Sequence, residues 1–223
     1  MSGQKKGAEP DDAFVAGVLE FTNWAKANQT TLAIFGVVLA VIIIGVISYS
    51  SQRERQLQQA GIQLEQIQVS VGVGDPDGAK VGLSQFLEQF GNTPYAGEAA
   101  LLLGQLYLES AQPDLALRAL ERVDIAPGDP LGAQALTLQA RAQEMTGSLA
   151  EAEETYLQIA DGAPMAFERT AARASAARVR ALRGNPSGAA ELYREILEEM
   201  EATDPDRGLY EMRLAEAEAA ARG

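Results

Sequence analysis

Four arginines in the C-terminal half of the chain are spaced so that they could bind a charged partner together. Arg169, Arg173, Arg180 and Arg183 are separated by 4, 7 and 3 residues. On a helix with 3.6 residues per turn, these steps place the four side chains within about 80° of one another. A guanidinium group donates paired hydrogen bonds to a carboxylate, so this arginine stripe predicts a site for an acidic segment or a C-terminal carboxylate.

Two interpretations of the arginine stripe follow from the sequence. In the first, the stripe lies on the concave wall of a helical domain and forms a partner-binding groove with Arg141 and Gln105. In the second it is a solvated face, as exposed charge runs usually are. Its arginines would then pair with nearby carboxylates, such as those of Glu144, Glu151 and Glu191. The opposite face of the same helix is expected to pack, because its residues are small or apolar: Ala171, Ser175, Val179 and Leu182.

The rest of the chain offers little catalytic chemistry. The 223 residues include no cysteine and no histidine, which excludes disulfides, thiol nucleophiles, Ser-His-Asp triads and histidine metal ligands. Adjacent carboxylates such as Glu153 and Glu154 diverge on a helix, so they are poor acid–base partners. The glycine-containing stretch 72–78 lacks the Lys-Ser/Thr of a phosphate loop and the ligand run of a calcium loop. We therefore predict no enzyme, no metal and no cofactor, with a carboxylate-based enzyme as the alternative from another class.

The charge balance argues against nucleic acid as a partner. The chain has 18 Lys and Arg against 31 Asp and Glu, a net charge of −13, and residues 51–223 account for −12 of it. The electrostatic field of such a chain repels a phosphate backbone. Protein partners are therefore expected.

One apolar segment is long enough to cross a membrane. Residues 30–49 carry no charge, and a helix of that length spans about 30 Å, the thickness of the hydrocarbon core of a bilayer. The alternatives are a buried core helix and a cleaved signal peptide, although the apolar run is longer than a usual signal sequence. Trp24 and Tyr49 flank the segment as expected for aromatic anchors at the membrane interface.

The residues around this segment leave its orientation open. Lys26 precedes it closely, whereas Arg53 and Arg55 follow it, so the positive-inside rule gives nearly a tie. Residues 11–26 have apolar side chains at helical spacing. They predict either an interfacial or docking helix, or a helix that continues into the span. We divide the chain into a tail (1–29), a transmembrane helix (30–49) and a C-terminal domain (50–223).

The C-terminal domain contains a repeated pattern. Four segments align without gaps, and their equivalent alanines are Ala79, Ala116, Ala152 and Ala189, at spacings of 37, 36 and 37 residues. Each segment has a Gly, or an Ala in the second copy, followed by a polar turn that starts a new helix. Four and seven residues after each alanine comes a large apolar or aromatic residue on the same helical face. A regular period of this length predicts stacked helical hairpins.

Two copies resemble the tetratricopeptide repeat. The first of them has Leu103-Gly104, Tyr107, Ala116 and Leu120, and the second keeps the spacing with Gly147, Ala152, Tyr156 and Pro164. The resemblance implies an all-α solenoid of about four helical hairpins, with residues 209–221 as a capping helix. Such a solenoid uses the concave face made by the first helix of each hairpin to bind proteins.

The whole layout is similar to the ancillary subunit family of the bacterial SecYEG translocon, the YfgM-like proteins. A short tail with an amphipathic segment, one span, a helix beginning SQRERQLQQAG and a C-terminal repeat domain carry this resemblance. It implies a single-pass protein of the inner membrane with a cytoplasmic N-terminus and a periplasmic repeat domain. The implied partners are a SecYEG-type translocon, a periplasmic chaperone such as PpiD, and unfolded client chains. The alternative is a scaffold of another envelope machine, for division or secretion assembly.

Overall fold

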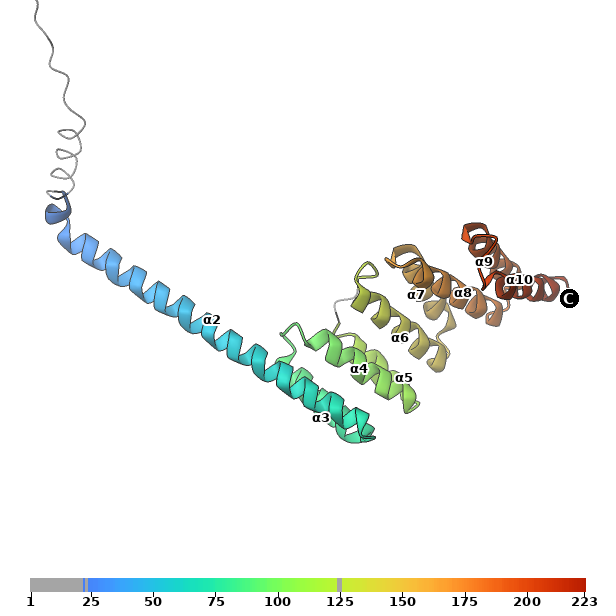
Figure 1. The fold of residues 1–223 in the computed structure, drawn as a ribbon, viewed down its shortest axis with the longest axis horizontal. Coiled ribbons are helices and arrows are strands. Elements are labelled where there is room, and N and C mark those ends of the chain that lie inside the picture. Colours follow the sequence, from blue (N-terminus) through green and yellow to red (C-terminus); the bar gives the residue numbers. More distant parts are fainter. Residues whose placement is uncertain (1–21, 23, 124–125) are drawn as a thin grey trace, which may run out of the picture. The chain divides into compact units, whose positions relative to one another are not determined.

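The computed structural model describes residue 22, residues 24–123 and residues 126–223. Throughout these ranges the chain is built of helices joined by short turns, as Figure 1 shows. The chain divides into two compact units, Met1–Gln56 and Leu57–Gly223. The predicted all-α fold with a long apolar N-terminal helix is confirmed. Most of the predicted amphipathic segment 11–26 lies outside the described residues.

The long helix α2 (Gln29–Gly72) belongs to both units, because the division falls inside it. Among the described residues, it is the helix that is long and apolar enough to cross a membrane. Apolar side chains such as Phe35 and Ile44 are exposed along it. Trp24 and Tyr49, the predicted interface anchors, are also exposed, and the Trp24 carbonyl accepts a hydrogen bond from the Asn28 side chain at 2.9 Å.

In the second unit, residues 57–72 of α2 and the following helices form hairpins. The first helices are α2, α4 (Ala96–Glu109), α6 (Pro130–Thr146) and α8 (Ala166–Leu182). The second helices are α3 (Pro76–Phe90), α5 (Pro113–Leu120), α7 (Leu149–Gly162) and α9 (Pro186–Glu199). The last helix, α10 (Arg207–Arg222), packs against α9 through residues such as Ala217.

The turns inside the hairpins follow the repeated pattern. The residues with positive φ in the described chain are the four that begin the aligned segments: Gly74, Ala111, Gly147 and Gly184, at 87°, 55°, 81° and 82°. This left-handed conformation ends the first helix and favours glycine, because a Cβ is crowded there. Two residues later, proline at the first turn starts α3, α5 and α9, where its fixed φ suits a helix and its missing N–H costs nothing.

The equivalent alanines are buried in the core clusters between helices. Ala79, Ala116, Ala152 and Ala189 are all fully or almost fully buried. The apolar positions four and seven residues later are buried too, from Leu83 and Phe86 in the first hairpin to Tyr193 and Ile196 in the fourth. The repeat therefore determines both the turns and the packing between hairpins, and it leaves one face of each first helix available for a site.

Candidate partner-binding groove

Two adjoining hollows lie on the surface made by the first helices. One has a volume of about 480 Å³ and is lined by residues of α4, α6, α7 and α8. The other, of about 490 Å³, is lined by α2, α4 and α6. Gln105, Gln134 and Leu138 line both. The two hollows therefore make one continuous surface, which we call the first-helix groove.

Helical spacing explains how this surface forms. On α4 the lining residues are Glu98, Leu101, Leu102 and Gln105, which are three or four positions apart and share one face. Leu103, on the other side of α4, belongs to the core, and Leu101 is part of the same buried cluster, so this lining rests directly on the core. The predicted groove residue Gln105 thus lies at the centre of the groove, and its Nε2 donates a hydrogen bond of 2.9 Å to Glu109.

The groove is mostly apolar or neutral. Leu101, Leu102 and Leu138 line the part near α4, and Ala171, Ala172 and Ser175 line the part near α8. Its charged lining residues are two carboxylates, Glu98 and Glu168. Phe167 lies beside Glu168 with 71% of its surface exposed. A contiguous apolar hollow that includes an exposed aromatic side chain is typical of a surface that binds another molecule.

The arginine stripe lies outside this groove, so the first interpretation of the stripe is not supported. As in the second interpretation, three of its arginines pair with carboxylates of neighbouring helices, although these are Glu153, Glu195 and Glu199. The face of α8 that lines the groove is the small-residue face with Ala171 and Ser175, which we expected to pack. The stripe contacts α7, the turn after it, and α9 instead. The physical reason is that carboxylates on these two helices offer the arginines partners inside the stack.

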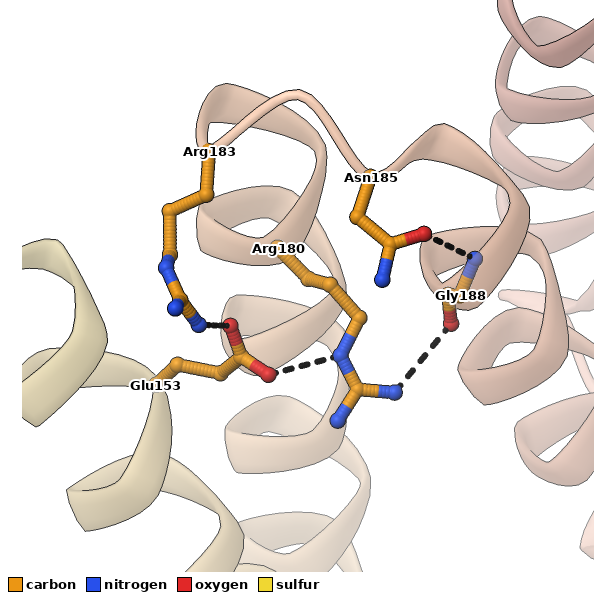
Figure 2. A network of polar contacts seen from close by, with 5 residues as sticks. All are labelled: Glu153, Arg180, Arg183, Asn185 and Gly188. Atoms are coloured by element: carbon orange, nitrogen blue, oxygen red, sulfur yellow. Dashed lines mark hydrogen bonds and ion pairs between the residues drawn. The ribbon is translucent and has the colours of Figure 1, made fainter.

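Figure 2 shows the strongest of these contacts, around Glu153 of α7. Its two carboxylate oxygens accept hydrogen bonds from Arg180 Nε at 2.7 Å and from Arg183 Nη1 at 2.5 Å. Arg180 also donates a 3.4 Å hydrogen bond to the carbonyl of Gly188. The Asn185 side chain caps the start of α9 by accepting a hydrogen bond from the Gly188 N–H at 2.9 Å. The network thus joins α7, α8 and the first turn of α9.

Burial and hydrogen bonding act in opposite directions on the Glu153 carboxylate. The side chain is only 9% exposed, and this burial alone would raise its pKa. The hydrogen bonds and positive charges of Arg180 and Arg183 lower it by more, so that the pKa of Glu153 lies below the usual glutamate value. The carboxylate is therefore charged at neutral pH and serves as a structural partner of both arginines.

The other two stripe residues are also engaged. Arg173 is 13% exposed and lies 2.8 Å from a carboxylate oxygen of Glu199 and 3.7 Å from one of Glu195, both on α9. Arg169 donates hydrogen bonds to the carbonyls of Ala163 and Pro164 at 3.0 and 3.1 Å. It thereby satisfies backbone groups at the end of α7 that the helix leaves unpaired.

A second network joins α6, α7 and α8. Arg178 donates two hydrogen bonds to the carboxylate of Glu144, at 2.6 and 2.7 Å, and the Tyr156 hydroxyl donates a third at 2.8 Å. Burial would raise the pKa of Glu144, but the hydrogen bonds from Arg178 and Tyr156 lower it below the usual value, aided by the charge of Arg141. Burial and the bond to Glu144 raise the pKa of Tyr156. Arg141 itself is exposed, one turn beyond Leu138 on α6.

This fold and groove agree with what the chain resembles in sequence. A profile of the tetratricopeptide repeat-like domain matches residues 22–219. The chain belongs to the tetratricopeptide repeat-like domain family. Repeats of this family are protein–protein interaction scaffolds rather than catalysts, and their partners are proteins.

Solved structures show the same repeat architecture. The nearly identical TPR-like repeats of a Podosopora anserina protein described as a kinesin light chain are 20% identical, with a TM-score of 0.59. The match covers 74% of this chain and 87% of that chain, and a single-substitution variant of those repeats gives the same values. At this identity the likeness concerns the fold alone. No curated protein sequence matches the chain.

Several residues of the first-helix groove were not predicted from the sequence. Gln134 and Thr137 of α6 line it, as do Phe167 and Glu168 at the start of α8. One signal in the sequence could have indicated which face of α8 lines the groove, and with it Phe167 and Glu168. The pairs Ala176-Ala177 and Ala189-Ala190 mark where α8 and α9 pack closely, and Glu195 and Glu199 are one turn apart on α9. These alanine pairs and glutamates together indicate that the arginine face of α8 packs against α9.

Proposed function

We propose that the protein is a membrane-anchored adaptor that holds segments of other protein chains in the first-helix groove. The observation that carries this proposal is the continuous, mostly apolar groove across α4, α6 and α8, with Phe167 exposed in it. Binding a protein segment would remove this apolar surface from water, which favours association. Groove amides such as those of Gln105 and Gln134 are suited to hydrogen-bond the backbone of an extended segment.

The apolar part of α2 supplies the anchor in this proposal. Its composition and length suit a membrane span, with Trp24 and Tyr49 at the two interfaces. Anchoring confines the repeat domain to the membrane surface and raises its effective concentration for chains that emerge there. A shallow groove with modest affinity is then sufficient, and bound segments are released readily.

The resemblance to the ancillary translocon subunits supports a specific location. We place the N-terminus in the cytoplasm and the repeat domain in the periplasm of the bacterial inner membrane. The bound segments would belong to newly translocated envelope proteins, and the neighbours would be a SecYEG-type translocon and a chaperone such as PpiD. The arginine stripe does not form the binding surface in this proposal, because its residues bind α7, α9 and the turn after α7.

Site-specific photocrosslinking in intact membranes tests this function. A photoreactive residue at Gln134, which is exposed in the groove, should crosslink to translocon subunits and exported chains identified by mass spectrometry. The same residue at Gln158, exposed on α7 outside the groove lining, is the matched control. Equal crosslinking at both positions, or division proteins as the dominant products at Gln134, would contradict the proposal.

Protease accessibility tests the proposed orientation separately. In cells with an intact outer membrane the repeat domain should resist added protease, and it should be digested once the periplasm is opened by osmotic shock. Digestion only after the inner membrane is also broken would place the repeat domain in the cytoplasm. That result would contradict the proposed role in binding translocated chains.

A further inference from the structure

We infer that the first-helix groove selects apolar protein segments that carry a basic side chain, and that Glu168 and Phe167 bind that side chain. This inference rests on the proposed function, because it names the kind of segment that the groove holds. It reverses the expectation of an acidic ligand that the arginine stripe suggested.

The first observation is that one oxygen of the Glu168 carboxylate has no hydrogen-bond partner in the part of the chain that the structure describes. Glu168 lines the groove near the start of α8, and its Oε2 is buried without a hydrogen-bond partner among the described residues. A buried carboxylate oxygen is costly when it is left unpaired, since it has lost water and gained no donor. The Glu168 side chain as a whole is partly exposed, so rotation about its side-chain bonds can present the carboxylate to a lysine or arginine of a bound segment. That residue would then supply the donor, in a charge-assisted hydrogen bond.

The charge of the groove is the second observation. Its two lining carboxylates, Glu98 and Glu168, are accompanied by no lysine or arginine in the lining. The nearby cations lie against groups outside the groove lining: Arg178 is paired with Glu144, and the stripe contacts carboxylates and carbonyls of α7, α9 and the turn after α7. Arg141 lies beyond the lining, on the side of Glu144. A basic segment is therefore complementary to the groove, whereas an acidic one meets like charge.

The exposed ring of Phe167 is the third observation. Phe167 and Glu168 are neighbours at the start of α8, and both line the same hollow. The face of an aromatic ring attracts a cation, most often the guanidinium of arginine. The ring also offers apolar surface to the stem of a long basic side chain. This pair can thus bind both the charge and the apolar part of one residue.

The dimensions of the groove indicate how long the segment is. Glu98 on α4 and Glu168 on α8 lie on first helices separated by α6. Packed helices are about 8–10 Å apart, so an extended chain of about six residues, at about 3.3 Å per residue, reaches from one carboxylate to the other. Apolar side chains between these ends would contact Leu101, Leu138 and Ala171.

Three labelled peptides test this selection with the full-length protein in nanodiscs. They are nine-residue peptides of Leu, Ala and Val that differ at one position, which is Arg, Gln or Glu. Fluorescence anisotropy should show that the Arg peptide binds at least about tenfold more tightly than the Gln peptide, as a charge-assisted hydrogen bond provides. The Glu peptide should bind more weakly than either.

Two variants assign the effect to the groove. Glu168→Gln should weaken binding of the Arg peptide about tenfold and leave the Gln peptide unchanged. Glu154→Gln is the matched control, because Glu154 is exposed on α7 outside the groove lining and its replacement changes net charge equally. Phe167→Ala should weaken all three peptides, and the Arg peptide most.

The outcomes separate this inference from the function on which it rests. Equal binding of the Arg and Gln peptides, or equal effects of Glu168→Gln and Glu154→Gln, would overturn the charge selection while the groove remained a binding surface. If no peptide bound and Gln134 gave no more crosslinks than Gln158, the proposed function itself would fail.

Discussion

The first two hairpins and the last two are held together by different interactions. The larger N-terminal core cluster contains nine leucines and phenylalanines among 18 buried residues, including the fully buried Leu83 and Phe86. The larger C-terminal cluster has 11 alanines among 18. The ion pairs that join different helices of the described chain lie in the C-terminal part, at Glu144, Glu153, Glu195, Glu199 and Glu218, whereas Lys80–Asp77 links two residues of α3.

This difference shows two ways to stack the same repeat. Large side chains remove more apolar surface from water, so the N-terminal hairpins gain most of their stability from burial. Alanine lets helices approach closely but buries less apolar surface per residue, and the arginine–glutamate contacts then fix how the helices align. Polar contacts of this kind are sensitive to charge and pH, whereas apolar packing is not.

The largest effect is expected from truncating the N-terminal core. Phe86→Ala removes a fully buried ring and should lower the free energy of unfolding by about 3–5 kcal/mol. Urea denaturation of the full chain, followed by hydrogen exchange of α3 and α4, measures this. Phe167→Ala is the control, because that ring is 71% exposed, and its replacement should cost less than about 1 kcal/mol. Similar losses of stability in the two variants would contradict the burial of Phe86 in the core.

A smaller loss is expected from breaking the network around Glu153. Glu153→Gln leaves Arg180 and Arg183 without their carboxylate, and we expect it to cost about 1–3 kcal/mol, the usual range for a partly buried group that loses a charged partner. Increased hydrogen exchange in α7–α9, with α3 and α4 unchanged, would locate the loss. Glu154→Gln should change stability by less than about 0.5 kcal/mol. If the two variants were equally stable, the network around Glu153 would not contribute to stability, which would contradict this account of the C-terminal hairpins.

Acid should weaken the C-terminal hairpins before the N-terminal ones. The pKa values of Glu153 and Glu144 are lowered in the folded protein, mainly because hydrogen bonds from arginines outweigh burial. The stability that these carboxylates provide is complete above their unfolded pKa and is lost as the pH falls through their folded pKa. Hydrogen exchange between pH 6 and pH 3, corrected for intrinsic rates, should show earlier loss of protection in α7–α9 than in α3–α4. Glu153→Gln should reduce this difference.

The smallest expected change is a gain of stability in the second hairpin. Ala111 has a φ of 55°, where the three equivalent turns have glycine. Ala111→Gly relieves the crowding of its Cβ and should stabilise the protein by about 0.5–1 kcal/mol. Ala181→Gly, at an exposed position of α8, should instead destabilise it by about the same amount. Destabilisation by both substitutions would contradict the assigned turn conformation.

The sequence predicted the helices and turns correctly, but it did not predict which face of α8 lines the groove. The period of 36–37 residues located the turns, the buried alanines and even the position where Ala111 replaces glycine. Gln105, which the sequence predicted as a groove residue, lines both hollows. Which face of α8 lines the groove depended on carboxylates 26–30 residues away in sequence from the arginines they bind, namely Glu153 and Glu199. Spacing within one helix carries no information about such partners.

Binding in the first-helix groove is tested by mapping where a bound segment contacts the full-length protein. Hydrogen exchange with and without the Arg peptide, in nanodiscs, should show protection in α4, α6 and α8, and little change in α5 and α9. Protection confined to α9, whose Glu195 and Glu199 lie beside Arg173 of the arginine stripe, would contradict it. That result would return the binding site to the surface first suggested by the spacing of the four arginines.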